Sequence, residues 1–215
     1  LPADGLAIFN YDNEYIKNYP YKNKCRKVSF GLRDGADYQA FDLKADLTGL
    51  NFKIRYKKKE VSLRTSLLGT HNLYNILAAF ALANELGVPL KELVYQTSVL
   101  ESVPNRLSLR TEANLVILDD GFNSNPEGFR NALDVLGYYS KYRILITPGI
   151  VEGGRNEEEI NYSLARKISE ICDLVILVET KASLAISRGL EELGFKNVKI
   201  VEDFREAMKY VRSKE

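Results

Sequence analysis

Histidine and asparagine side chains gather in one short segment, Gly69-Thr-His71-Asn72-Leu-Tyr-Asn75. Asn72 and Asn75 are three residues apart and His71 and Asn75 four apart, so in a helix they share one face near the first turn. An Asn amide offers a donor and an acceptor side by side, which suits the edge of an adenine base. The segment is therefore a candidate nucleotide contact, with a structural role for His71 as the alternative.

A second polar cluster runs from Asp119 through Asp120, Asn123, Ser124 and Asn125, directly after a short apolar run. A carboxylate at a strand end can accept hydrogen bonds from a ribose diol or help to hold a cation. Asn and Ser side chains beside a helix N-terminus add donors where the helix dipole favours an anion. The alternative, which these residues alone leave open, is that the Asp and Asn side chains only cap and turn the chain.

The loop Thr147–Arg155 is rich in glycine, which permits close approach of a ligand to the backbone. It matches neither GxGxxG nor GxxxxGK[ST], so a flexible surface loop is the favoured interpretation. No Ser/His/Asp or Cys/His set for nucleophilic catalysis is recognisable. A single histidine also leaves no His-based metal site.

The first third of the sequence predicts strands. A short apolar run and three alternating runs occur at Val28–Gly31, Phe41–Leu47, Asn51–Tyr56 and Val61–Leu67. The last two are separated by a polar turn and predict a hairpin. Its Lys57–Lys59 run could bind phosphate, but a solvated hairpin tip is favoured because the whole chain is near neutral. Helices are expected at 73–86, closed by Gly87, and at 89–100.

The second half predicts strands that alternate with helices. Apolar strands are expected at 115–118, 143–146, 174–178 and 198–201, and helices at 126–136, 157–171, 182–193 and 204–211, the first of them capped by Asn125. This pattern predicts a parallel sheet covered on both faces, a Rossmann-like α/β domain of about 110 residues. Ligands bind outside the carboxyl ends of such strands, where the loops after residues 118 and 146 lie.

Composition excludes several classes of protein. The chain has 215 residues, with 30 Lys and Arg against 29 Asp and Glu, and its formal charge is +1. A dedicated nucleic-acid or anionic-membrane binder usually carries a basic excess, so neither partner is expected. No run approaches the ~18 apolar residues of a membrane span, and no signal peptide is recognisable. Cys25 and Cys172 are far apart, without metal-ligand spacing, and indicate reduced thiols in a cytoplasmic protein.

Five motifs, taken in order, resemble the Mur ligase family, whose members use ATP to join an amino acid or dipeptide to a growing UDP-muramoyl peptide. They are Leu1–Asp12, ending in Asn10-Tyr-Asp12; Gly69-Thr-His71-Asn72-x-x-Asn75-x-x-Ala78-Ala79; Pro104-Asn-Arg106; Asp119-Asp-Gly-Phe-Asn-Ser-Asn-Pro126; and Thr147-Pro-Gly-Ile-Val-Glu-Gly-Gly154. The last two most resemble the branch that adds D-Ala-D-Ala. The resemblance implies that residues 1–103 are the second half of the family's central α/β ATPase domain and that residues 104–215 are its Rossmann-like C-terminal domain.

The resemblance also implies roles for single residues. Asn75 would contact adenine, with His71 and Asn72 as support on the nucleotide side. Arg106 would reach the ATP phosphates, and Asp120 would bind the ribose hydroxyls. Asn123, Ser124 and Asn125 would face the amino substrate and the acyl-phosphate, where positioning and charge neutralisation supply most of the catalysis.

Departures from the family pattern limit what this chain is expected to do. The family's phosphate-binding loop, the Mg²⁺-binding acid after it, the carbamylated lysine and the UDP-binding domain would all precede Leu1, and no GxxxxGK[ST] occurs in the 215 residues. Gly121 replaces the usual Ser and Gly153 the usual Leu. The chain begins without Met, which fits a piece of a longer protein. We expect this piece to have no metal site and no complete catalytic set, and to be inactive alone.

The parent protein is expected to be a cytoplasmic, ATP- and Mg²⁺-dependent ligase acting on UDP-MurNAc-peptide and D-Ala-D-Ala. One alternative is another ligase of the superfamily, of the folylpolyglutamate or cyanophycin synthetase type. Another is a non-catalytic nucleotide-binding module.

Overall fold

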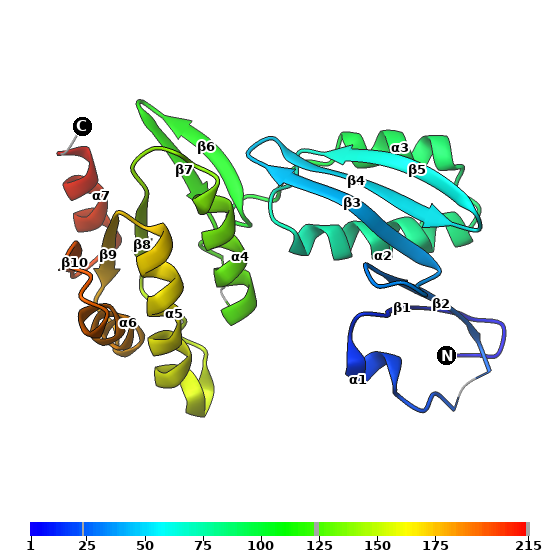
Figure 1. Ribbon diagram of the computed structural model, residues 1–215, viewed down its shortest axis with the longest axis horizontal. Helices are drawn as coiled ribbons and strands as arrows, with labels where there is room; N and C mark the ends of the chain where they lie inside the picture. The colour runs from blue at the N-terminus through cyan, green and yellow to red at the C-terminus, as the bar shows by residue number, and fades with distance from the viewer. Residues whose placement is uncertain (23, 123–124, 214–215) are drawn as a thin grey trace. The chain divides into compact units, whose positions relative to one another are not determined.

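A computed structural model describes residues 1–22, 24–122 and 125–213. The chain divides into two compact units, Leu1–Ser102 and Val103–Glu215 (Figure 1). Each unit has its own hydrophobic core. The expected α/β class, with a parallel-sheet domain in the second half, is confirmed.

The first unit is built on one five-stranded sheet in the order β1-β2-β3-β4-β5. The pairs β1·β2 and β2·β3 are parallel, whereas β3·β4 and β4·β5 are antiparallel. Helix α2 packs on the first three strands and α3 on the last, and the short α1 follows β1. The elements are β1 (Leu6–Asn10), α1 (Glu14–Lys17), β2 (Arg26–Gly31), β3 (Tyr38–Asp46), β4 (Gly49–Tyr56), β5 (Lys59–Thr65), α2 (His71–Glu85) and α3 (Leu90–Ser98).

Helix α2 is fixed to this sheet by an apolar stripe and by a buried carboxylate at its last residue. Leu73, Ile76, Leu77, Phe80 and Ala81 are buried in the core of the first unit. The Glu85 carboxylate, 5% exposed, accepts hydrogen bonds from the Tyr38 and Tyr56 hydroxyls at 2.7 and 3.0 Å and pairs with Arg26 at 2.7 Å. Gly87 then ends the helix region at φ +94°, as its sequence position predicts.

The second unit contains a three-stranded parallel sheet in the order β10-β9-β8 and a separate antiparallel pair, β6-β7. Alternate residues of β9 enter two clusters: Val175 and Leu177 pack with α4, α5 and α6, while Ile176 packs with α7. The sheet is therefore covered on both faces, as predicted. The elements are β6 (Ser108–Glu112), β7 (Leu115–Asp119), α4 (Pro126–Gly137), β8 (Ile144–Thr147), the 3₁₀ turn η1 (Gly154–Asn156), α5 (Glu157–Ile171), β9 (Leu174–Val178), α6 (Lys181–Glu192), β10 (Val198–Val201) and α7 (Phe204–Arg212).

Four elements were missed or wrongly assigned from the sequence. α1 and β6 were missed because they are short and largely polar, and β1 was missed although residues 6–9 form a short apolar run. β7 was expected to join the parallel sheet, but among the described residues it pairs antiparallel with β6 alone. An apolar run specifies a strand but not its partner.

The hairpin between β4 and β5 matches the expected solvated tip. Lys57 and Lys58 both have positive φ, +44° and +64°, between the paired residues Tyr56 and Lys59. That is the two-residue turn with two positive φ values that suits the twist of a hairpin, formed here without Asn or Gly. Lys57 is 69% exposed and lies over the Tyr56 ring.

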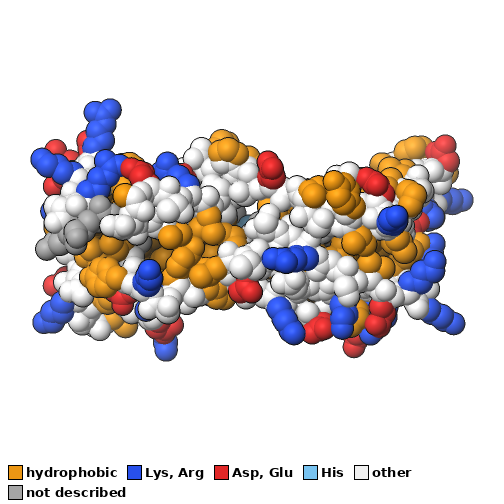
Figure 2. All heavy atoms as spheres, turned by 90° about the horizontal axis from the view of Figure 1, so that it is seen from above, with side chains coloured by type: hydrophobic (Ala, Val, Ile, Leu, Met, Phe, Trp, Pro, Cys, Tyr) orange, Lys and Arg blue, Asp and Glu red, His pale blue; other side chains and the backbone are white. Residues whose placement is uncertain are grey.

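The surface charges, the helices and the two cysteines can be compared with what the composition predicts. On the face shown in Figure 2, basic side chains are interspersed with acidic ones, and apolar side chains gather between them. None of the helices in the described part of the chain has the length and apolar character to cross a membrane. Cys25 and Cys172 form no disulfide, which agrees with the predicted thiols, and both are buried. Burial raises the pKa of Cys172 to about 12.

Candidate functional site

The first cluster of candidate residues lies at the N-terminus of α2. His71 is the first helical residue and is half-buried. The Asn72 amide donates to the Leu68 carbonyl at 2.7 Å and accepts from the Asn75 amide at 3.2 Å. Asn72 is thus fixed by the Leu68 carbonyl and in turn holds the amide of Asn75, whose side chain is exposed. Asn75 is therefore the residue of this cluster that is best placed to contact a ligand.

Asn75 lines a groove of about 730 Å³ in the first unit. The other lining residues come from β1, α1, β2, α2 and the segment between α1 and β2, and they are mostly apolar: Ala7, Ile8, Phe9, Asn10, Ile16, Tyr21, Lys27, Phe30, Ala78, Ala79 and Leu82. An apolar groove with amides at its wall can hold a flat heteroaromatic ring and hydrogen-bond its edge. The groove walls offer both apolar side chains and amides for such a contact.

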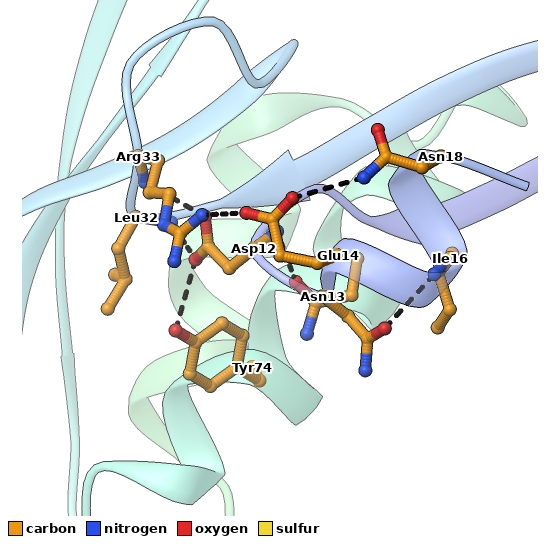
Figure 3. A network of polar contacts seen from close by, with 9 residues as sticks. Asp12, Asn13, Glu14, Ile16, Asn18, Leu32, Arg33 and Tyr74 are labelled. Carbon is orange, nitrogen blue, oxygen red and sulfur yellow. Dashed lines mark hydrogen bonds and ion pairs between the residues drawn. The ribbon is translucent and has the colours of Figure 1, made fainter.

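A carboxylate network, which sequence reasoning missed, positions the same end of α2 (Figure 3). Asp12 accepts hydrogen bonds from the backbone N–H of Leu32 and Arg33 at 2.6 and 3.1 Å, and from the Tyr74 hydroxyl at 3.0 Å. One side chain thus joins the residues after β1, the residues after β2 and the turn of α2 next to Asn75. The sequence signal for this network was the motif Asn10-Tyr-Asp12. In the structure, the Asn10 side chain accepts a hydrogen bond from the Asp12 N–H at 2.9 Å.

Beside Asp12, Gly31 leaves no room for a side chain. A Cβ built on it would lie 2.7 Å from a carboxylate oxygen of Asp12. The close approach explains the glycine at the end of β2, because a larger residue would displace the carboxylate from its three donors.

Arg106 and Asp120 are brought together in the second unit. The Asp120 carboxylate accepts from the Leu107 N–H at 3.0 Å and so holds the turn in which Asn105 and Leu107 have positive φ values. The Arg106 guanidinium lies 4.1 Å from the centre of the Phe122 ring. Asp120 therefore supports the segment that carries Arg106. Its role in binding the ribose hydroxyls, which the resemblance implies, stays a prediction.

Arg106 and Asn125 line one pocket of about 320 Å³, together with Pro126, Ile150, Glu152, Gly153 and Ile160. Asn125 is the N-cap of α4, as predicted, and accepts from the Gly128 N–H at 2.8 Å. Asn123 and Ser124, the other two predicted substrate contacts, lie outside the described residues. The pocket thus contains a guanidinium, a helix N-terminus and a carboxylate.

The loop after β8 reaches this pocket and is fixed at its start. Asn161 is fully buried, accepts from the Ile150 N–H and donates to the Ile150 carbonyl, each at 2.8 Å. Gly149 has φ +79°, and a Cβ on it would lie 2.8 Å from the Asn161 amide oxygen. The flexible-surface interpretation is wrong for this part of the loop, because Thr147, Gly149 and Ile150 are buried.

The described residues offer no group of three or more His, Cys, Asp or Glu side chains placed to hold a metal ion. Asp119 accepts from the Gly121 N–H at 3.2 Å and faces Arg110 at 3.8 Å, so its carboxylate shapes the turn after β7. These contacts fit the capping-and-turning alternative for Asp119.

The chain is similar to known proteins along almost its whole length. Residues 1–83 match the profile of the Mur ligase middle domain, and residues 105–215 match that of the Mur ligase, glutamate ligase domain. The chain is 31% identical over 197 residues to the UDP-N-acetylmuramoyl-tripeptide--D-alanyl-D-alanine ligase of Escherichia coli strain K12, covering 89% of this chain and 44% of that protein. It is 38% identical over 137 residues to the UDP-N-acetylmuramoyl-L-alanyl-D-glutamate--2,6-diaminopimelate ligase of Chlamydia muridarum, covering 63% of this chain and 28% of that protein.

Solved structures show the same fold. A crystal structure of MurF from Acinetobacter baumannii superposes with a TM-score of 0.85 at 26% identity, covering 98% of this chain and 46% of that one. MurF from Thermotoga maritima in complex with ADP gives 0.80 at 19% identity, covering 99% and 48%. The chain spans less than half the length of these relatives. Since profiles of two successive Mur ligase domains together match most of its residues, the chain belongs to the Mur ligase family.

Proposed function

We propose that this chain is the adenine- and amine-binding part of an ATP-dependent ligase that adds D-Ala-D-Ala to UDP-MurNAc-tripeptide in peptidoglycan precursor synthesis. The observation that carries the proposal is the pocket of the second unit. There the loop after β7, with Asn125, and the loop after β8, with Glu152, meet Arg106. Both loops have sequences typical of the D-Ala-D-Ala-adding branch.

The chemistry assigns separate tasks to these residues. In such a ligase a carboxylate of the peptide is first phosphorylated by ATP. The amine nitrogen, in its deprotonated form, then attacks the acyl carbon and the C–N bond forms. The C–O bond to phosphate breaks, and inorganic phosphate leaves as the nitrogen loses a proton. Arg106 and the N-terminus of α4 favour the anionic phosphoryl group, while Asn75 binds the adenine base. Mg²⁺, when bound, supplies charge neutralisation at the phosphates.

A diaminopimelate-adding ligase is the second candidate, because the Chlamydia muridarum relative has that name and the higher identity over its shorter match. The two candidates differ in the amino substrate and share the acyl-phosphate route. Folylpolyglutamate synthase of Thermotoga maritima shares the fold, with a TM-score of 0.60 at 20% identity, and gives no further support for its own substrate.

An acceptor panel tests the proposal. The whole ligase that contains this chain is supplied with ATP, Mg²⁺ and UDP-MurNAc-tripeptide, and then with D-Ala-D-Ala, diaminopimelate or glutamate. UDP-MurNAc-dipeptide and folate serve as alternative carboxylate substrates in place of the tripeptide. D-Ala-D-Ala-dependent phosphate release with the tripeptide supports the proposal, whereas turnover with another pair and none with this one overturns it.

A further inference from the structure

Two side chains of opposite charge line the 320 Å³ pocket of the second unit without pairing with each other. Arg106 precedes β6, and Glu152 follows β8. Within the described part of the chain, neither residue belongs to an ion pair. Arg106 instead lies against the Phe122 ring, and the Glu152 side chain is exposed. The pocket therefore presents one cation and one anion that a ligand can reach.

The backbone on both sides of Glu152 is held in place. On one side, Asn161 binds both the N–H and the C=O of Ile150, which is 2% exposed. On the other, a Cβ on Gly153 would lie 2.6 Å from the Cα of Glu157, so this backbone lies directly against the start of α5. The loop thus presents the carboxylate from a fixed backbone, which lowers the entropy lost when a ligand binds.

Charge matching identifies the ligand class. An amino acid or dipeptide carries an ammonium group before it reacts, and the acyl-phosphate that it attacks is an anion. The Arg106 guanidinium can bind the anion, and the Glu152 carboxylate can accept charge-assisted hydrogen bonds from the ammonium. Ile150, Ile160 and Pro126 supply an apolar wall in a small volume, which favours a ligand with small side chains.

We propose that the Glu152 carboxylate binds the ammonium group of the amino substrate, a small zwitterionic amino acid or dipeptide, and so sets its position relative to the phosphoryl group at Arg106. The inference rests on the proposed ligase function. It adds a residue that neither the family resemblance nor the Asn-rich loop had assigned to the amine.

Binding of D-Ala-D-Ala to this 215-residue chain, followed by NMR of the ¹⁵N-labelled protein, tests the inference directly. The dipeptide is expected to shift the amide signal of Gly153, and Glu152→Gln is expected to weaken its Kd by at least about tenfold. N-acetyl-D-Ala-D-Ala, which lacks the ammonium, should bind weakly to both forms. Glu159→Gln removes the same charge from an exposed residue of α5 outside the pocket and should leave the Kd unchanged.

The inference is overturned if Glu152→Gln binds the dipeptide as well as the unmodified chain does, or if the acetylated dipeptide binds as tightly as the free one. Each of these results would mean that Glu152 does not recognise an ammonium. If D-Ala-D-Ala shifts no pocket amide up to its solubility limit, the same titration is made with diaminopimelate. The inference is overturned if neither ligand shifts a pocket amide.

Kinetics of the whole ligase separate this inference from the proposed function. Glu152→Gln should raise KM for the amino substrate while KM for ATP stays unchanged. If the ligase uses diaminopimelate and this variant raises KM for it, the ammonium contact stands and D-Ala-D-Ala is the wrong substrate. If D-Ala-D-Ala is used and its KM does not change, the function stands and the inference fails.

Discussion

Asp12 shows at the scale of single residues how this chain positions a contact that is distant in sequence. Its carboxylate accepts from two backbone amides and from the Tyr74 hydroxyl, one residue before Asn75. A hydrogen bond to a charged acceptor contributes more to stability than one between neutral groups. The side chain of Tyr74 thus contributes both to the stability of the first unit and to the orientation of the end of α2.

Tyr74→Phe removes that donor and keeps the ring. The free energy of unfolding of the first unit should fall by about 1.5 kcal/mol, measured by urea titration. Tyr95→Phe, at a ring that is 59% exposed, is the matched control and should change stability little. Equal stability of Tyr74→Phe and the unmodified chain would show that the Asp12 network does not hold α2.

At the scale of elements, the two ends of α2 are held by carboxylates, Asp12 near its start and Glu85 at its last residue. Burial opposes ionisation of Glu85, but the hydrogen bonds from Tyr38 and Tyr56 and the charges of Arg26 and Lys57 outweigh it. The pKa of Glu85 therefore lies below its ordinary value of 4.5. A carboxylate with a lowered folded pKa stabilises the fold above the unfolded value, and this stabilisation is lost as the pH falls through the folded pKa.

Glu85→Gln should accordingly cost stability at pH 7 and progressively less as the pH falls below 4.5, because the ionised form is the one that the tyrosines and Arg26 favour. Urea unfolding of the variant and the unmodified chain at several pH values measures the difference. Glu101→Gln, at an exposed residue of the same unit, should show a small difference at every pH. A Glu85→Gln effect that is independent of pH would contradict the assignment.

The loop after β8 depends on one residue of α5. Asn161→Ala leaves the buried N–H and C=O of Ile150 without their partners and should reduce the stability of the second unit by roughly 2–4 kcal/mol. Asn197→Ala, which removes one exposed bond to the Asp173 carbonyl, should cost well under half as much. Urea unfolding of both variants makes the comparison, and similar losses would show that Asn161 is not the anchor.

Sequence patterns were most reliable where one periodicity runs through a whole element. α5, β9 and β10 have the predicted bounds, and Asn125 caps α4, since a stripe or an apolar run between polar turns is a local property. Pairing is not local, so β7 was assigned the wrong partner. For the same reason Asp12–Tyr74 and Ile150–Asn161 were missed: each joins residues that only the fold brings together.

At the scale of the whole molecule, each unit contains part of the site that the proposed ligase would need. The first has an apolar groove beside Asn75, and the second has a pocket with Arg106, Asn125 and Glu152. The sequence contains no GxxxxGK[ST] loop to grip the β- and γ-phosphates. The chain spans less than half the length of its relatives.

We therefore expect the 215-residue chain alone to release no phosphate from ATP above background, with or without UDP-MurNAc-tripeptide and D-Ala-D-Ala. A colorimetric phosphate assay, with the whole ligase as the positive control, measures this. Turnover by the short chain that requires the substrates would show that its own residues suffice for phosphoryl transfer.

If the pocket formed by the loops after β7 and β8 selects D-Ala-D-Ala, the whole ligase adds this dipeptide in preference to other amines. The most direct measurement is a competition reaction in which the whole ligase receives ATP, UDP-MurNAc-tripeptide and UDP-MurNAc-dipeptide, with D-Ala-D-Ala and diaminopimelate at equal concentration. Mass spectrometry then identifies the product. We expect UDP-MurNAc-pentapeptide with D-Ala-D-Ala at its end. A product that contains newly added diaminopimelate, with no pentapeptide, would show that the pocket does not select D-Ala-D-Ala.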